Sequence, residues 1–451
     1  MIHFTRTLLD VSVQWINSLL KKGDKKIINA WGMYDWANSV YSLVITSTIF
    51  PIYYNNVTED NVIFFGREFA NTALYAYSIT AALLIIALIS PILSSIADYS
   101  GRKKGFMQFF CYMGSLSCCS MFFFDGSNLY LGIFTFILAG VGWSGSIVFY
   151  NSYLPEIAEE KDLDRVSAKG FSMGYIGSVL LLLFNLFMLM SPETFGFSQE
   201  QLDDKFPARL SFLLVGFWWM GFAQITFRKL PTNIYGKRPT GNTIWNGYKA
   251  LIVVLKQIKE INYLRYFLLS FFFYMMGVQT VMWLAATFGE KDLKLDSEVL
   301  ITTVLVIQLV AILGAYGFSR LSMRIGNIPT WIVQVIIWIG ICVGTFYFVF
   351  DANSFIIIAA WVGLVMGGIQ SLSRSTYAKL LPDTQSHASF FSFYDVCEKI
   401  ATALGTLSFG IIEELTGSMR NSLLALAIFF LVGLLFLFVT HRLAAKRLAI
   451  D

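Results

Sequence analysis

Charged residues are scarce in this chain. Only 14% of its 451 residues are Asp, Glu, Lys or Arg, while 56% are hydrophobic. A soluble domain is nearer one quarter charged and one half apolar. The shortage of charge argues against a soluble protein and favours a lipid bilayer as the solvent. Apolar runs recur along nearly the whole chain, which leaves room for roughly twelve spans of about 20 residues joined by short loops.

Cysteine and histidine are also few, and neither forms a cluster. The cysteines lie in apolar runs without C-x-x-C spacing, so we interpret them as small buried hydrophobic residues, not as disulfides or metal ligands. The cysteines are Cys111, Cys118, Cys119, Cys342 and Cys397, and the histidines are His3, His387 and His441. Because the histidines are scattered, the sequence predicts no metal site and no bound cofactor.

Sequence signatures of catalysis are missing as well. The chain has no Ser/His/Asp set, no His-Glu-x-x-His and no Gly-rich phosphate loop, which argues against an enzyme. It has no Walker motif, which argues against ATP drive within the chain. The net charge of +4 is modest, and the basic residues belong to predicted loops, so we expect no nucleic-acid partner. No cleavable signal peptide is evident.

The apolar runs predict twelve helical spans. Their predicted ranges are 27–53, 70–97, 103–124, 128–153, 165–190, 208–228, 261–288, 299–320, 328–350, 354–380, 387–412 and 420–441. Residues 1–26 precede the spans, and their alternating apolar and basic positions predict an amphipathic segment on the membrane surface. We therefore expect six-helix bundles at 27–228 and 261–442, a basic linker at 229–260 and a tail at 443–451.

Twelve spans place both termini on one side of the membrane, and the basic residues identify that side. Two basic residues, Arg374 and Lys399, fall within spans. The side opposite the termini has Arg67, Lys205, Arg209, Lys291, Lys294 and Arg420, and all the others of the chain's 33 lie with the termini. By the positive-inside rule the termini are cytoplasmic.

The linker at 229–260 divides the spans six and six. Its second half places Leu251, Ile252, Val254, Leu255 and Ile258 among lysines, which suits a surface helix on anionic lipid. A solvated connection explains the first half equally well.

The two predicted halves resemble each other in sequence. Span four ends GVGWSGSIVFYNSYLPEI and span ten ends MGGIQSLSRSTYAKLLPDT. With an offset of 227, Ser144, Ser146 and Tyr150 fall on Ser371, Ser373 and Tyr377, and both segments close on Leu-Pro-acid. Chance similarity among apolar helices is the alternative, but the shared ending in register makes it weaker. The repeat favours an all-α membrane protein built from two pseudo-symmetric six-helix bundles.

The loop between spans two and three carries a family resemblance. Residues 94–104 read SSIADYSGRKK, which resembles the major facilitator signature Gly-x-x-x-Asp-x-x-Gly-Arg-Lys with Ser94 in place of the first glycine. Gly101 permits a tight turn, and Asp98 can accept hydrogen bonds from the N-terminus of a neighbouring helix. The resemblance implies a substrate site between the halves near the membrane midplane, about which the halves rock.

Two cytoplasmic latches are predicted from this loop and its repeat. Arg102 can fork onto Glu156 at the end of span four. In the second half Arg320 stands where Asp98 would be, but Arg324 is retained and Asp383 is its expected partner. The alternative is that these are ordinary surface ion pairs, worth about 0–1 kcal/mol each.

Two further segments narrow the resemblance. Span one contains Tyr-Asp-Trp-Ala-Asn from Tyr34 to Asn38, and span ten contains Gln-x-x-x-Arg-Ser from Gln370 to Ser375. Together they resemble the vacuolar amino-acid effluxer branch of the major facilitators, in a prokaryotic member. The resemblance implies amino-acid export or uptake with proton drive, and the bacterial-looking loops point to a bacterial cytoplasmic membrane.

Ionisable residues within spans are costly, so each is a functional candidate. Asp395 and Lys399 are four residues apart on one helix face and can neutralise each other. Glu398 then needs a partner, for which we expect Arg374. Asp35 has no opposite charge on its own helix. The alternative is that these charges only hold spans one, ten and eleven together.

These charges suggest a transport mechanism. Asp35 or Glu398, with Asp395 as a third candidate, would carry the coupling proton, because a desolvated carboxylate binds protons readily. Arg374, assisted by Lys399, would hold a substrate carboxylate.

Uncharged residues on spans one, four, seven and ten complete the expected lining. They are Tyr34, Asn38, Tyr41, Tyr150, Asn151, Gln279, Trp283, Gln370 and Ser373. For any single one, packing between helices is the alternative. The cargo also has alternatives, namely a sugar, peptide, nucleoside or drug, and a non-transporting receptor is a further possibility. We expect a monomer whose partners are a small solute, protons and membrane lipid.

Overall fold

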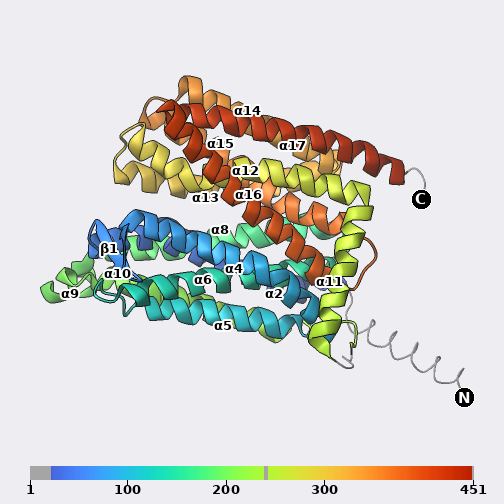
Figure 1. The fold of residues 1–451 in the computed structure, drawn as a ribbon, viewed down its shortest axis with the longest axis horizontal. Coiled ribbons are helices and arrows are strands. Elements are labelled where there is room, and N and C mark those ends of the chain that lie inside the picture. Colours follow the sequence, from blue (N-terminus) through green and yellow to red (C-terminus); the bar gives the residue numbers. More distant parts are fainter. Residues whose placement is uncertain (1–21, 238–241, 449–451) are drawn as a thin grey trace, which may run out of the picture.

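The computed structural model describes residues 22–237 and 242–448, and the chain is largely helical (Figure 1). The predicted amphipathic segment at 1–26 falls almost entirely outside these residues. The N-terminal half contains α2 (Lys25–Val40), η1 (Tyr41–Ile49), α3 (Phe50–Val57), β1 (Asn61–Phe64), β2 (Arg67–Ala70), α4 (Asn71–Ser100), α5 (Lys103–Met121), α6 (Leu129–Ser152), α7 (Leu154–Ile157), η2 (Glu160–Asp162), α8 (Leu163–Met190), η3 (Pro192–Phe195), α9 (Gln199–Asp203) and α10 (Phe206–Lys229). After α11 (Thr243–Glu260), the C-terminal half contains α12 (Asn262–Lys291), α13 (Ser297–Ile325), α14 (Asn327–Phe348), α15 (Ala352–Leu380), α16 (His387–Thr416) and α17 (Met419–Leu448).

These elements supply the twelve predicted spans within a few residues of the expected bounds. Nine of the described helices are long and apolar enough to cross a membrane on composition alone. The other three spans are α5, the charged α16, and span one, which is divided among α2, η1 and α3.

Span one changes its helical geometry in the middle. The segment Tyr41–Ile49 is a π-helix. Two hydroxyls inside it bond to carbonyls five residues back, from Thr48 Oγ1 to Leu43 O at 2.7 Å and from Ser47 Oγ to Ser42 O at 2.9 Å. Such wide turns are uncommon, and they occur preferentially at functional sites.

Two pairs of corresponding helices are buried to the same extent. The apolar windows of α4 and α13 are each 28% buried, whereas those of α6 and α15 are each 61% buried. Equivalent tyrosines also pack alike, since Tyr150 stacks on Trp31 of the first span and Tyr377 on Phe267 of the seventh. The structure therefore agrees with the repeat that was read from the sequence.

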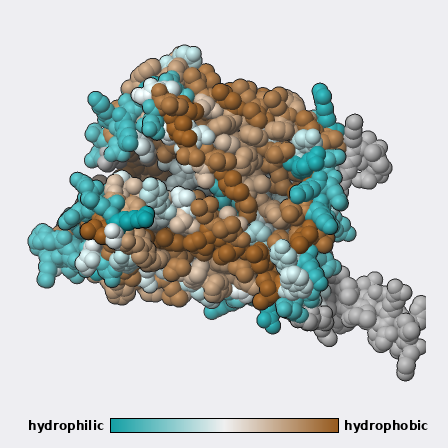
Figure 2. Space-filling model, in the orientation of Figure 1, coloured by the Kyte–Doolittle hydropathy of each residue, from teal (hydrophilic) through white to brown (hydrophobic). Residues whose placement is uncertain are grey.

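The two ends of the bundle differ. Helix α11 runs across the ends of the spans on what we call the linker face, where α2 begins, and the β1–β2 hairpin lies on the opposite, hairpin face (Figure 1). Figure 2 shows a recess between the halves at the hairpin face. At the linker face the halves are in contact, and that is where the polar residues converge.

Candidate functional site: a polar interface between the two halves

The centre of the interface is an ion pair between Arg374 of α15 and Asp35 of α2. The Arg374 Nη1 and Nη2 atoms lie 3.2 and 3.3 Å from Asp35 Oδ2. Tyr150 donates its hydroxyl to the same oxygen at 2.7 Å. Both charged side chains are almost completely buried. The pair joins one half to the other, whereas the sequence suggested Glu398 as the partner of Arg374; that expectation is wrong.

The remaining donors of Arg374 are also occupied. One donates to Asn151 Oδ1 at 3.1 Å. Two others donate to the hydroxyl and the backbone carbonyl of Ser167, at 2.9 Å each. The guanidinium carbon lies 4.8 Å from the ring centre of Trp31 and 4.2 Å from that of Phe171. Arg374 therefore closes the linker face in this conformation and presents no free donor to a solute.

A second charged cluster lies on α16 and α12. Gln279 donates to Glu398 Oε1 at 2.7 Å. The Lys399 ammonium lies 3.3 Å from Asp395 Oδ1, as the four-residue spacing predicted, and 4.0 Å from Glu398 Oε1. It also lies 5.6 Å from the ring centre of Trp143 on α6, so the cluster faces the other half.

This cluster retains unused polar capacity. The Glu398 side chain is 22% exposed, while those of Lys399 and Asp395 are 8% and 5% exposed. Asp395 Oδ2 and the Trp143 indole N–H are buried without a hydrogen-bond partner among the described residues. A ligand with both a donor and an acceptor group would satisfy these atoms, because a buried polar atom without a partner is costly.

At the linker face Asp98 accepts hydrogen bonds from the start of α16. Its carboxylate takes the backbone N–H groups of Ala388 and Ser389, at 3.3 and 2.7 Å, and the Ser389 hydroxyl at 2.8 Å. This is the kind of contact expected of Asp98, since unpaired N–H groups at a helix start favour an anion. Gly101 ends α4 in the left-handed conformation with φ of 70°, which glycine adopts without strain.

Glu156 has different partners from the predicted one. Its Oε1 accepts from the Lys103 ammonium and lies 3.0 Å from His387 Nδ1 of the other half. Arg102 is exposed and forms no ion pair with the described residues, so the predicted Arg102–Glu156 latch is wrong. Arg102 and Lys103 are consecutive at the helix start, and α5 turns only Lys103 inward.

The linker segment also reaches this contact. The Tyr235 hydroxyl lies 3.2 Å from His387 Nδ1, and Lys237 Nζ donates to Asp98 O at 2.8 Å and to Gln385 O at 3.1 Å. Burial lowers the pKa of Lys237, an effect that the nearby Asp98 carboxylate partly opposes. Residues 235–237 thus bridge the two halves at the linker face.

A third contact was missed by sequence reasoning. Asp164 of α8, 1% exposed, accepts from Ser322 Oγ and Asn327 Nδ2 at 2.8 Å each and from Lys379 Nζ at 2.7 Å. These donors come from three helices of the C-terminal half. The predicted Arg324–Asp383 pair is absent, because both side chains are exposed and the structure does not bring them together. In the sequence Asp164 resembles any acid in the first turn of a span.

The other predicted lining residues are divided between the interface and the bundle interiors. Gln370 accepts from Tyr175 of the other half at 2.8 Å, and Trp283 is half-buried. Tyr34 packs against Tyr150 and Phe227 inside the N-terminal half, while Tyr41 packs against Trp143 and Trp219. Asn38 is buried, and its amide N–H₂ has no hydrogen-bond partner in the part of the chain that the structure describes. Ser373 bonds to Tyr274 within its own half.

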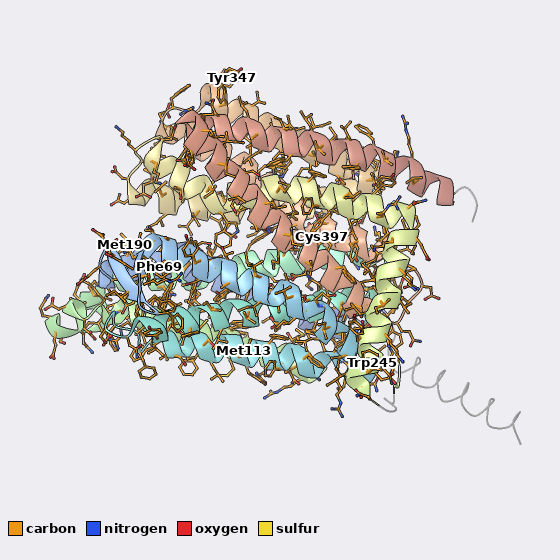
Figure 3. All side chains as sticks on the ribbon, viewed as in Figure 1. Phe69, Met113, Met190, Trp245, Tyr347 and Cys397 are labelled. Carbon is orange, nitrogen blue, oxygen red and sulfur yellow. The ribbon has the colours of Figure 1, made fainter. Side chains whose placement is uncertain are left out.

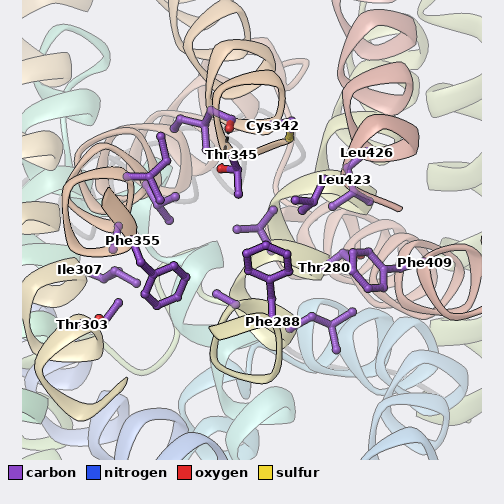
Figure 4. Close-up of a pocket in the computed structure, with 17 residues that line it drawn as sticks. Thr280, Phe288, Thr303, Ile307, Cys342, Thr345, Phe355, Phe409, Leu423 and Leu426 are labelled. Atoms are coloured by element: carbon purple, nitrogen blue, oxygen red, sulfur yellow. Dashed lines mark hydrogen bonds between the residues drawn. The ribbon is translucent and has the colours of Figure 1, made fainter. Parts of the chain in front are cut away.

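An apolar pocket lies inside the C-terminal half, away from these polar residues (Figure 4). Helices α12 to α17 all contribute to its wall, including Phe288, Phe355 and Phe409. Thr280, Thr303 and Thr345 are its few hydroxyl-bearing residues. A polar solute finds no charge there, so we place the candidate site at the interface between the halves.

Comparison with known proteins identifies the family. A family profile described as "Vacuole effluxer Atg22 like" matches residues 23–449. The MFS-type transporter YxiO of Bacillus subtilis, itself described as uncharacterized, is 33% identical over 412 residues, covering 91% of this chain and 93% of that relative. The chain belongs to the Atg22-like effluxer family. Autophagy-related protein 22 of Eremothecium gossypii is 24% identical to this Atg22-like chain over 459 residues, covering 88% of this chain and 87% of the relative.

A solved structure supports the fold of this Atg22-like protein. The major facilitator proton:xylose symporter XylE aligns with a TM-score of 0.69 at 12% identity, covering 92% of this chain and 94% of that one. At this identity the likeness establishes the fold alone. Together with the family, it makes the chain an integral membrane protein with the twelve-helix major facilitator fold and transport as its function.

Proposed function

We propose that this Atg22-like transporter moves a small zwitterion, with an amino acid as the first candidate, by alternating access coupled to protons. The observation that carries the proposal is the cluster of Glu398, Lys399 and Asp395 facing Trp143. Within one helical turn it offers carboxylates that can bind the ammonium group of a solute and an ammonium that can bind its carboxylate. Lys399 is paired with Asp395, so Glu398 is the member with the weakest counter-charge. The ammonium group of a zwitterion would supply that counter-charge and a neutral sugar would not, which favours a zwitterion.

The proton path is proposed to run through Asp35. In the present conformation Arg374 neutralises Asp35 across the interface. When the halves separate at the linker face, Arg374 leaves and the carboxylate loses its counter-charge. A buried carboxylate without a counter-charge binds a proton more readily. Separation of the ion pair would thereby couple proton uptake at Asp35 to the conformational change.

The linker face is proposed to be cytoplasmic, in keeping with the excess of basic residues on that side of the chain. The conformation described here would then be closed to the cytoplasm, with the recess of Figure 2 facing outward. Opening would require the contacts of Arg374, Asp98, Glu156 and Asp164 to separate. We propose a bacterial cytoplasmic membrane as the location and a monomer as the transporting unit.

The proposal is tested by flux into proteoliposomes. The purified chain is reconstituted, and uptake of each amino acid, of xylose and of a dipeptide is measured with and without an imposed pH gradient. Accumulation of one or more amino acids that depends on the gradient is expected. Gradient-dependent uptake of the sugar alone, or no flux of any solute, would contradict the zwitterion assignment.

Two variants separate binding from coupling. Glu398→Gln removes a charged contact to the substrate and should raise KM by about 10–100-fold, the usual range for a hydrogen bond to a charged group. Glu414→Gln, an exposed acid on the same helix, is the matched control and should leave KM unchanged. Asp35→Asn should abolish gradient-driven accumulation and spare counterflow exchange. If accumulation persists in Asp35→Asn, this residue does not carry the proton.

A further inference from the structure

Helix α11 exposes an apolar stripe that the described part of the chain leaves uncovered. Ile244, Tyr248, Ile252 and Leu255 follow one another at three- and four-residue spacing and are 68%, 42%, 39% and 37% exposed. Residues at this spacing lie on one side of a helix. An apolar stripe of this length is expected to have a partner, because contiguous exposed apolar surface marks interaction sites.

The neighbouring stripe is basic and aromatic. Each of its residues directly follows a residue of the apolar stripe in the sequence, and all of them are exposed: Trp245, Lys249, Val253 and Lys256. Trp245, labelled in Figure 3, stacks on Tyr248 at 5.7 Å between ring centres, and the Lys249 ammonium lies 5.7 Å from the Trp245 ring. A helix with apolar, aromatic and lysine residues on one exposed side is typical of those that lie in the headgroup region of a bilayer.

The opposite side of α11 is fixed to the protein. Gly247, Val254 and Ile258 are buried. Ser95 of α4 donates to Gly247 O at 2.6 Å, and Asn246 Nδ2 donates to Tyr99 OH at 3.0 Å. A Cβ on Gly247 would collide with Ile96, so α11 and α4 are in close contact there. The exposed stripes are therefore held in a fixed orientation, across the ends of the spans as seen in Figure 1.

We propose that α11 is a binding surface for anionic lipid headgroups of the leaflet at the linker face. Three observations favour a lipid surface as the occupant over a soluble protein. The helix lies across the spans, which is the direction of the membrane plane. It is attached to α4, a span whose apolar window is only 28% buried within the protein. Its exposed lysines, Lys249, Lys256 and Lys259, are opposed on the helix only by Glu260.

Lipid bound there also acts on the contact between the halves. Helix α11 is attached to α4 at Ser95 and Tyr99, and Asp98, between them, accepts hydrogen bonds from the start of α16. Anionic lipid on α11 therefore stabilises the closed linker face together with the folded chain.

The test compares the response of the full chain to two lipids. Thermal unfolding in detergent is followed while dioleoylphosphatidylglycerol or dioleoylphosphatidylcholine is added. The variant Lys249→Gln/Lys256→Gln/Lys259→Gln removes the charges of α11. The matched control Lys205→Gln/Lys291→Gln/Lys294→Gln removes the same charge from exposed lysines near the opposite face.

The native chain should gain more thermal stability from the anionic lipid than from the zwitterionic one. Each lysine near a charged surface contributes about fivefold in affinity, so the α11 variant should need at least about tenfold more phosphatidylglycerol for the same shift. The control should respond like the native chain, and 0.5 M salt should weaken the response of both. An undiminished response in the α11 variant, or an equal loss in the control, would overturn the proposal.

A second measurement distinguishes lipid from another occupant. A bimane label at Ile252→Cys, in a chain without its native cysteines, is placed in phosphatidylglycerol nanodiscs that contain headgroup-depth nitroxide lipid. Quenching of bimane is expected, and a label at Glu193→Cys on the opposite face corrects for general exposure to lipid. An unquenched Ile252 label would mean that a second copy or a soluble protein covers α11, and would refute a lipid surface.

Discussion

Replacing Asp35 with asparagine probes how the two halves are held together. In the native chain Asp35 and Arg374 form a buried ion pair across the closed linker face. Asp35→Asn leaves the guanidinium buried without its counter-charge. Removing one partner of a buried pair costs about 3–5 kcal/mol. Arg374 keeps its bonds to Asn151 and Ser167, so we expect the lower end of this range.

The cost falls on the closed conformation, because in the open one Arg374 is free to find water or lipid phosphate. Since about 1.4 kcal/mol is a factor of ten, the closed-to-open ratio should fall by about 100-fold. Spin labels at Lys161→Cys and Arg442→Cys, on the two halves near the linker face, report this ratio as a distance distribution. The native chain should give one short-distance population, and Asp35→Asn a second at longer distance.

The double variant Asp35→Asn/Arg374→Gln is the control for this argument. It removes both charges, so no buried charge is left unpaired, and the short distance should be largely recovered. An unchanged distribution in Asp35→Asn would refute the view that this ion pair holds the linker face closed. A double variant that is as open as the single would mean that hydrogen bonds, rather than charge pairing, do so.

Three further predictions concern stability. Lys103→Glu and Glu156→Lys should each lower the unfolding temperature, by an amount corresponding to about 3–5 kcal/mol for a broken buried pair, and the double swap should recover most of the loss in thermal melts. Gly101→Ala should cost about 1–2 kcal/mol because of its positive φ, whereas Gly105→Ala, in a helix with open space around it, should not destabilise the chain in the same assay. The hydrogen bond from the Ser354 backbone N–H holds the pKa of the Asp351 carboxyl below its usual value. The contribution of this bond to protein stability is therefore present above about pH 4 and is lost as the pH falls through the lower folded pKa. Asp351→Asn should abolish this acid dependence of melting.

The spans and their grouping into two halves could be predicted from sequence, because apolar length and a repeat in register are local properties of the chain. The contact of Asp98 with the start of a helix could also be predicted, because Asp98 belongs to a motif in which the carboxylate accepts from a helix N-terminus. The partner of Glu156 did not follow, since Arg102 and Lys103 are adjacent and only the path of the chain into α5 decides which points inward. Because the two basic residues are adjacent, their spacing from Glu156 could not show that Lys103 is its partner.

The ion pair of Arg374 shows a different limit. Asp35 and Arg374 are 339 residues apart and belong to different halves. Their contact forms across the interface between the halves, and no local pattern in the sequence shows which residues of one half face those of the other. Reasoning from neighbouring spans therefore selected Glu398, whose position on α16 is near in sequence, and overlooked Asp35 across the interface.

The acidic contacts across the linker-face interface all run in one direction. The N-terminal half supplies the acids, which are Asp35, Asp98, Glu156 and Asp164. The donors that reach these acids across the interface come from the C-terminal half and include Arg374, the start of α16, His387 and Lys379. By the repeat, the second half would carry an acid at the position of Arg320, which corresponds to Asp98. In the structure the acid at that end of the second half is Asp164, which comes from the N-terminal half across the interface. An ionised carboxylate accepts stronger hydrogen bonds than a neutral one. A proton taken up by any of these acids therefore weakens the contact between the halves in the same direction, toward opening at the linker face.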